Sequence, residues 1–290
     1  MQEMRQITRE RVEANQYLLE KYRKKGIPLT FIAYFTGNDS IDMWQGLNDL
    51  GRKFLVSTDL HSERNSALLK IEDNAKKGCI LDAITLSIVR RLGIKKAVSS
   101  VCGPIYTTQS IINLFKFRLT LAEQNLGKKM GFMTWQDNKL IYTEYSQEML
   151  KKIAKERKEE LKWVKENVAI VPTLPKNDLP KEVKRIMNLI DNEVSDPAIA
   201  SEGKNILLLS EDFGFRIWSE SNFNISSTWL QPVLMSALNN NFIKIDKYRE
   251  VINSLVLMGH TYISLDSNCL MPFGYKRIKV ITQYSWWSNS

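Results

Sequence analysis

The chain has 290 residues, of which 43% are hydrophobic and 10% aromatic, and its formal net charge is +9. This length suits one large domain or a main domain with a smaller appendage, and the composition excludes a low-complexity or disordered chain. The positive charge is compatible with an anionic partner such as nucleic acid, but it does not identify one.

Neither a targeting segment nor a cysteine framework can be recognised in the sequence. The first residues, "MQEMRQITRERVEANQ", lack the apolar centre of a signal peptide, and the apolar runs elsewhere are shorter than the roughly 18 residues of a membrane span. The cysteines and histidines are widely spaced: Cys79, Cys102, Cys269, His61 and His260. This spacing predicts no disulfide framework and no zinc site. We therefore expect a cytoplasmic protein with reduced thiols and no membrane partner.

The first 77 residues predict a mostly helical N-terminal extension. The apolar spacing favours a helix over residues 1–25, ended by Gly26 and Pro28, and a short helical stretch near residues 42–50. The stretch "KFLVST" is typical of a strand. A helix with Ser62 as its N-cap is expected in "HSERNSALLKIEDNAKK".

From Gly78 onwards, strand and helix patterns alternate. The expected order is strand, helix, strand, helix in "CILDA", "ITLSIVRRLG", "KAVSSVCGPIY" and "TQSIINLFKFRLTLAEQN". Such alternation predicts an α/β fold in which helices cover both faces of a parallel sheet. Residues 132–135 and 140–143 flank the turn-prone "QDN", which predicts an inserted β-hairpin at about 130–145. The predicted domains are 1–77 and 78–290.

The remaining elements continue the alternation. Helices are expected in "KKIAKERKEELKWVKEN", "KEVKRIMNLIDNE", "WLQPVLMSALNNN" and "IDKYREVINSLVLMG", and strands in "ILLL" and "TYISLD". Pro232 is tolerated if its helix begins near Gln231, and it kinks the helix if the start is at Ser227. The final "GYKRIKVITQYSWW" either binds nucleic acid through its cations and aromatic rings or forms a last strand that packs on the body.

Acidic residues follow two of the predicted strands. Asp82 ends "CILD", and Glu211 and Asp212 end "ILLLSED". The carboxyl ends of parallel strands meet at one edge of the sheet, where ligands bind, so these acids can lie close together. Clustered carboxylates raise one another's pKa unless a cation neutralises them, and oxygen ligands suit Mg²⁺ or Mn²⁺. Asp196, which begins "DPAIA", is a further candidate and is expected to cap a short helix. The alternative for each acid is a helix cap or a solvated loop residue.

Other chemistries find little support in the sequence. A P-loop, a glycine-rich nucleotide fingerprint, a nucleophile elbow and a zinc-protease motif are all absent. The two histidines, His61 and His260, are expected to be structural. The acidic edge is therefore the candidate site.

The acid-bearing stretches resemble a known family. "CILDAITLSIVRRLGI", "DPAIASEGKNILLLSEDFGFR" and "WLQPVLMSALNNNFIKIDKYREVINSLVLMGHTYISLD" together resemble PIN-domain nucleases over residues 78–268. The likeness is greatest to the PIN modules at the C-terminal end of large bacterial tetratricopeptide-repeat proteins. The resemblance implies a Rossmann-like three-layer α/β/α domain, a Mg²⁺ or Mn²⁺ site and hydrolysis of phosphodiester bonds, usually in RNA. It places Asp82, Asp196 and Asp212 as metal ligands and catalytic acids, with Glu211 beside them.

Two positions depart from the family pattern. The family usually has Ser or Thr two residues after the first acid, where this chain has Ile84, with Thr85 one place later. The helix after the second strand usually carries an acid, and Asn113 stands there. An asparagine can coordinate through its carbonyl oxygen, but it contributes no charge, so a metal would bind more weakly.

Basic residues near the predicted site are candidates for holding a phosphate backbone. They are Arg90, Arg91, Lys95 and Lys96. A solvated helix end explains them equally well. Asn113 is the further candidate for substrate binding.

The sequence therefore predicts a metal-dependent endonuclease. An endoribonuclease is the favoured form of this prediction. The alternative is a catalytically degenerate PIN-like module that binds nucleic acid or a protein partner. A toxin of a toxin–antitoxin system or an antiviral defence effector would use the same chemistry under control. RNA is favoured over DNA as the partner, and a regulatory protein, a repeat-protein partner and a homo-oligomer remain open.

Overall fold

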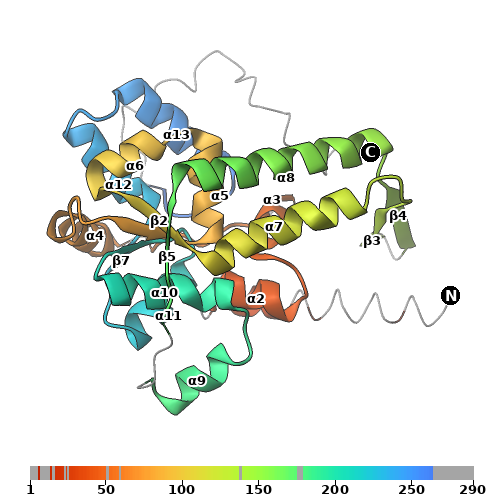
Figure 1. The fold of residues 1–290 in the computed structure, drawn as a ribbon, viewed down its shortest axis with the longest axis horizontal. Coiled ribbons are helices and arrows are strands. Elements are labelled where there is room, and N and C mark those ends of the chain that lie inside the picture. The colour runs from red at the N-terminus through yellow and green to blue at the C-terminus, as the bar shows by residue number, and fades with distance from the viewer. Residues whose placement is uncertain are drawn as a thin grey trace.

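The structure is a computed structural model, and it describes residues 6, 14, 17–22, 24, 26–49, 52–58, 60–136, 139–174 and 179–263. A five-stranded parallel sheet lies at its centre (Figure 1). The strand order is β5-β2-β1-β6-β7. The strands are β1 Cys79–Leu81, β2 Ile105–Thr108, β5 Ala169–Val171, β6 Leu207–Leu209 and β7 Ser227–Thr228. Because all of them run in parallel, their carboxyl ends share one edge. The predicted α/β fold with a parallel sheet is confirmed.

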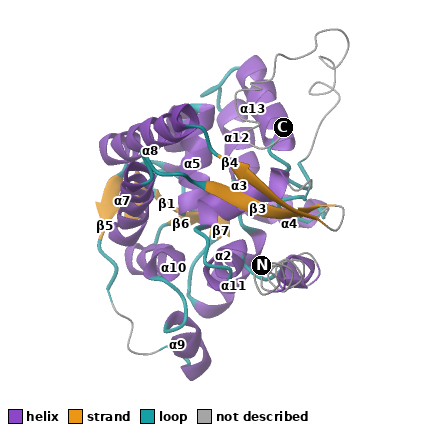
Figure 2. Ribbon diagram, turned by 90° about the vertical axis from the view of Figure 1, so that its right-hand side faces the viewer, coloured by secondary structure: helices purple, strands orange, loops and turns teal. Residues whose placement is uncertain are grey.

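Helices pack against both faces of the sheet. Figure 2 shows α10 and α11 on one side, with α12 and α13 on the other. The helices that follow residue 78 are α5 Ala83–Leu92, α6 Lys95–Cys102, α7 Gln109–Gln124, α8 Gln147–Asn167, α9 Lys181–Met187, α10 Asn192–Lys204, α11 Phe213–Asn222, α12 Leu230–Asn239 and α13 Ile245–Leu257.

The central strands are apolar throughout because both of their faces are covered. In β1, Cys79 and Leu81 belong to a core shared with α5, α6 and α12, whereas Ile80 belongs to a second core shared with α10 and α11. Side chains of a strand point alternately to opposite faces, so neither face leaves room for a polar residue. The first polar side chains therefore appear where the strands end.

The N-terminal extension packs into the first of these cores. Among its described residues are the helices α2 Leu29–Phe35, α3 Ser40–Asp49 and α4 His61–Asp73. Leu29, Trp44, Phe54 and Ile71 are buried in the same cluster as Cys79. The boundary between residues 77 and 78 stays a prediction.

The predicted hairpin is present. Strands β3 Gly131–Gln136 and β4 Lys139–Glu144 pair antiparallel between α7 and α8. Figure 1 shows this hairpin at the ends of α7 and α8 that point away from the central sheet. It is therefore an insertion on a helical arm and does not extend the parallel sheet.

Some local predictions were wrong. Residues 95–102 form helix α6, because the buried Ala97, Val98, Val101 and Cys102 recur at helical spacing. In "KFLVST" the structure has only an isolated bridge from Phe54 to His260. Asp196 does not cap a helix, since it lies inside α10, whose N-cap is Asp191. Ser62 is likewise inside α4, whose N-cap is Leu60.

Some predicted segments lie partly or wholly outside the described residues. The last part of "TYISLD" and the whole of the stretch "GYKRIKVITQYSWW" lie outside them. Pro232 is the third residue of α12, in the first turn, where it is tolerated. Within the part of the chain that is described, no helix has the length and apolar character needed to cross a membrane.

Gly103, the residue after α6, allows a close approach of two backbones. Its φ is +93°, and an added Cβ would lie 2.5 Å from the carbonyl oxygen of Lys76. We expect Gly103→Ala to lower the free energy of unfolding by about 2–3 kcal/mol, through the left-handed conformation and the backbone clash together. Urea unfolding checks this. Gly203→Ala is the control, because its Cβ would meet nothing within 4 Å. Equal stability of the two variants would contradict the prediction.

Candidate active site

Asp82 lies at the carboxyl end of β1 and begins α5. Its Oδ1 atom accepts a hydrogen bond of 2.7 Å from the backbone N–H of Thr85, so the side chain caps the helix. Its Oδ2 atom is buried and has no hydrogen-bond partner among the described residues. Burial raises the pKa of Asp82, the charge of Glu211 adds to the rise, and hydrogen bonds from Ser210 and Thr85 oppose it.

Asp212 occupies the matching place after β6 and caps α11. Its Oδ1 accepts from the N–H of Phe215 at 3.3 Å, and its Oδ2 accepts from the N–H of Thr30 in α2 at 3.3 Å. The residue is fully buried. Burial raises the pKa of Asp212 to about 7, and the charge of Asp82 contributes to the rise. The two carboxylates that follow these adjacent strands thus affect each other electrostatically.

Two hydroxyl groups connect the ends of β1 and β6. The Ser210 hydroxyl accepts from the N–H of Asp212 at 3.2 Å, and the Thr85 hydroxyl accepts from the N–H of Glu211 at 2.8 Å. Both hydroxyls also lower the pKa of Asp82 against the effect of its burial. Thr85, one place beyond the position where the family usually has Ser or Thr, therefore lies in the site.

Glu211 faces a different set of partners. Its Oε1 accepts a hydrogen bond of 2.6 Å from the N–H of Leu230, the first residue of α12. Its Oε2 lies 2.9 Å from Nδ1 of His260, and both side chains are buried. Glu211 therefore connects β6 to α12 and to the residue that bridges Phe54.

Asp196 comes from α10 and is half-buried. Burial raises its pKa, and hydrogen bonds from the hydroxyls of Ser110 and Thr173 oppose the rise. These partners place it beside the start of α7 and the segment after β5. Asp196 thus approaches the carboxyl edge from the side of β2 and β5.

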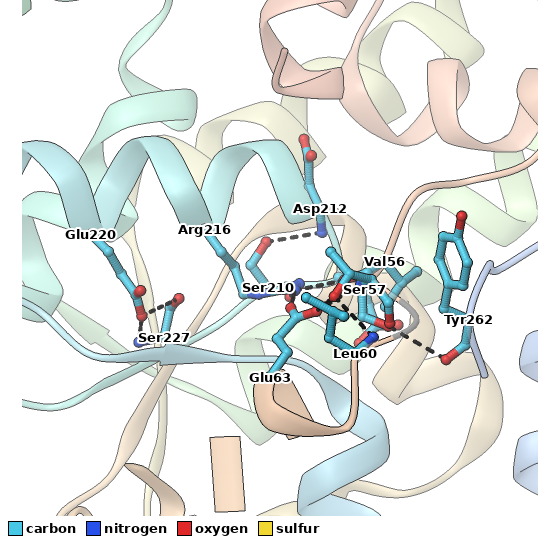
Figure 3. Close-up of polar contacts among 12 residues, drawn as sticks. Val56, Ser57, Leu60, Glu63, Ser210, Asp212, Arg216, Glu220, Ser227 and Tyr262 are labelled. Carbon is cyan, nitrogen blue, oxygen red and sulfur yellow. Dashed lines mark hydrogen bonds and ion pairs between the residues drawn. The ribbon is translucent and has the colours of Figure 1, made fainter. Parts of the chain in front are cut away.

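Arg216 is a buried residue that sequence reasoning missed. Its Nη1 donates to the backbone oxygen of Ser210 at 2.8 Å, and its Nη2 donates to that of Val56 at 2.6 Å and pairs with Glu63 at 3.4 Å. In Figure 3 the carboxylate of Asp212 points away from this group. An arginine one turn after the acids of "SEDFGFR" was the available signal. Its role is to hold the Ser210 turn against the N-terminal extension.

Residues 80–221 match the family model described as the PIN domain associated with the TPR-GreAB-C-PIN system. This part of the chain is a PIN domain of that family. The matched range contains Asp82, Asp196 and Asp212. No curated protein and no solved structure matches the chain.

The acids of this PIN domain offer the kind of ligand atom that a divalent ion prefers, but the structure does not group them as a metal site. Carboxylate oxygens are suitable ligands, and Oδ2 of Asp82 is buried without a partner. Asp212, however, has a backbone N–H on each oxygen and no exposed surface. Across the described ranges, no three His, Cys, Asp or Glu side chains are grouped so that they could hold a metal ion. The arrangement as it stands therefore does not form a metal centre.

The predicted substrate-binding residues lie apart from Asp82. Arg90 and Arg91 are in the last turn of α5, about 12 Å along the helix axis from its start. The guanidinium of Arg91 lies over the Trp44 ring at 5.3 Å, and burial lowers its pKa. Lys95 donates to the side chain of Asn167 at 3.1 Å, and Lys96 follows it in the first turn of α6.

Asn113 is exposed on α7. Its side-chain oxygen accepts from the amide of Gln109 at 2.9 Å. Because α7 begins where β2 ends, the helix starts at the edge of the sheet that carries the acids. Where the resemblance predicts a carboxylate, the structure thus has an uncharged side chain in a polar pair.

Proposed function

We propose that the PIN domain of this chain hydrolyses phosphodiester bonds, in RNA rather than DNA, with the help of Mg²⁺ or Mn²⁺. The supporting observation is the pair of buried carboxylates, Asp82 and Asp212, at the ends of adjacent strands, where the charge of one raises the pKa of the other. Like charges at a buried edge are costly to keep, and perturbed acids of this kind are typical of functional sites.

The residues have distinct roles in this proposal. Asp82, Asp196 and Asp212 would hold the ion, which would supply positive charge to stabilise the charge that develops on the phosphate oxygens. Ser210 and Thr85 orient Asp82 through their hydroxyl groups, and Arg216 holds the backbone at Ser210. Thr85 also binds the backbone of Glu211, and Arg216 binds that of Val56, so these contacts hold the ends of β1 and β6 to each other and to the N-terminal extension.

Charge and family support the choice of partner. The net charge of +9 favours a polyanion, whose binding weakens as salt rises. The family is associated with tetratricopeptide-repeat systems, which makes a repeat protein the proposed regulatory partner in the cytoplasm. A toxin or an antiviral effector would carry out the same reaction, with its activity controlled by such a partner.

The decisive experiment is cleavage of labelled single-stranded RNA, folded RNA and single-stranded DNA by the purified chain. We expect RNA to be cut with Mn²⁺ and left intact with chelator, and Asp212→Asn to be inactive. Circular dichroism establishes that the variant is folded. No cutting of any substrate by a folded wild-type chain would refute the nuclease.

The second candidate is a PIN-like module that binds without cutting. Asn113 favours it, because an uncharged residue replaces an acid. Such a module should bind labelled RNA equally well with Mn²⁺ and with chelator. Binding that needs Mn²⁺ and Asp212 would instead favour the nuclease.

A further inference from the structure

Helix α8 carries a regular line of exposed lysines, here called the lysine row. The helix has 21 residues, and the row recurs at every third or fourth of them: Lys151, Lys155, Lys158, Lys162 and Lys165. Residues at this spacing lie on one side of a helix, and a rise of 1.5 Å per residue makes the row about 21 Å long. Five positive charges therefore follow one line along the arm that α7, the hairpin and α8 form (Figure 1).

Only one lysine of the row has an ion-pair partner among the described residues. Nζ of Lys162 lies 3.9 Å from Oε1 of Glu166, and both side chains are exposed. An exposed pair of this kind is weak, so it leaves the lysine available to another anion. The exposed glutamates of α8 are spaced eleven and seven residues apart and form a separate line beside the row: Glu148, Glu159 and Glu166.

Buried residues on the opposite side of α8 fix the helix to the domain. Glu160 accepts a hydrogen bond of 2.7 Å from the hydroxyl of Ser87 in α5. Arg157 pairs with Asp42 of α3 at 2.8 Å, and Val164 is fully buried in the main core. The lysine row is therefore held on a rigid element, and its charges keep a fixed line without any partner bound.

The neighbouring helix α7 links this arm to the candidate active site. The two helices lie side by side in both views (Figures 1 and 2). One exposed side of α7 carries neutral or basic residues at helical spacing: Gln109, Asn113, Lys116, Thr120 and Gln124. This side begins where β2 ends, at the edge of the sheet that carries the acids. Asn113 stands where the resemblance predicts an acid, so this surface does not repel an anion near that edge.

We propose that the lysine row binds the phosphate backbone of single-stranded RNA and holds it beside α7, whose start lies at the acidic edge. The inference rests on the proposed function and supplies its substrate-binding surface. The basic residues between α5 and α6 suit this role less well, because the Arg91 guanidinium lies over the Trp44 ring and Lys95 donates to a side chain of α8. A line of lysines contacts phosphates rather than bases, so it accepts RNA of any sequence.

Binding of this kind has a measurable dependence on salt. Each lysine that contacts a phosphate displaces counterions from the RNA. The logarithm of the binding constant therefore falls against the logarithm of the salt concentration by about 0.7 for each contact on a single strand. Removing three contacts makes this slope shallower by about 2.

The test is fluorescence anisotropy of labelled single-stranded RNA with the full chain, in chelator, over a series of salt concentrations. The triple variant Lys155→Gln, Lys158→Gln, Lys165→Gln removes three exposed cations of the row, and glutamine preserves the helix. We expect its slope to be shallower by about 2 and its affinity at low salt to be weaker by on the order of ten-fold. Circular dichroism establishes that it is folded. If it is not, the single variants Lys155→Gln and Lys158→Gln should each change the slope by about 0.7.

The matched control is the triple variant Lys77→Gln, Lys204→Gln, Lys244→Gln. It removes the same charge from exposed residues outside the row. Lys77 and Lys204 shortly precede β1 and β6, at the edge of the sheet opposite the acids. This control should bind as the wild type does. An equal change of slope in both triple variants would overturn the proposal, because the net charge of the chain would then attract the RNA. A wild-type slope in the row variant would also overturn it, and so would a wild type that binds no RNA.

The two proposals fail in different ways. Weaker RNA binding by the row variant alone, with no cleavage of any substrate by the wild type, would refute the nuclease and keep the lysine row. Cleavage by the wild type, with equal affinity and slope in both triple variants, would refute the lysine row and keep the nuclease.

Discussion

Replacing Asp82 with asparagine is expected to lower the rate of RNA cleavage by about 100-fold to 1,000-fold, the usual cost of losing one electrostatic contact in an active site. Asp82 follows β1, and its buried Oδ2 has no hydrogen-bond partner among the described residues, so capping α5 occupies only one of its two oxygens. The carboxamide keeps the shape of the side chain but not its charge. Single-turnover cleavage of labelled RNA measures the effect.

The fold should survive this change. Asparagine caps helices as well as aspartate does, so the hydrogen bond from the N–H of Thr85 can be kept. Asp73→Asn is the control, because it removes the same charge from an exposed residue of α4. If Asp82→Asn cleaves as fast as Asp73→Asn, Asp82 is a helix cap only.

The two strands that precede the acids can be predicted from the sequence, because each is a short apolar run followed directly by a helical pattern. β1 and β6 are buried on both faces, so their apolar runs are unbroken up to Asp82 and Ser210. Each is followed by a helix whose first residues the acid caps. The order of strand, acid and helix is local, so the sequence alone predicts it.

Short edge elements were not predictable. β5 has three residues, two of them exposed, and β7 has two residues, so neither carries a readable apolar pattern. Helix α6 contains the β-branched residues Val98 and Val101, which favour strands, so its sequence predicts a strand although its buried residues recur at helical spacing. Tertiary packing, not local propensity, decides these segments.

The environment of the acids depends on contacts far apart in the chain. Thr30 reaches Asp212 over 182 residues of sequence, and Thr85 reaches Glu211 over 126. Arg216 joins Val56 and Glu63 in the same manner. A repeating sequence pattern reflects only neighbouring residues and gives no sign of such long-range contacts. The acids can therefore be predicted from the sequence, but the residues that enclose them cannot.

Arg118 of α7 is the second residue whose replacement should have a large effect, this time on stability. Its guanidinium is buried and pairs with Asp39 and, at 2.9 Å, with Asp42. Burial alone would lower the pKa of Arg118, but these two aspartates raise it. The pair joins the N-terminal extension to the helix that follows β2.

We expect Arg118→Leu to lower the free energy of unfolding by about 3 kcal/mol, because the nearly buried Asp39 loses the charge that neutralises it. Burial already raises the pKa of Asp39 to about 6 against the opposing effect of Arg118. Urea unfolding measures the loss. Arg249→Leu is the control, since its partner Asp246 is exposed and such pairs contribute less than about 1 kcal/mol.

A second change separates the lost pair from lost packing. Adding Asp39→Asn to Arg118→Leu removes the uncompensated charge, so part of the stability should return, although the arginine is still absent. If the double variant is no more stable than Arg118→Leu, the arginine acts through its packing and not through its charge. Recovery would show that the uncompensated charge of Asp39 causes part of the loss, and hence that the ion pair helps to attach the extension to α7.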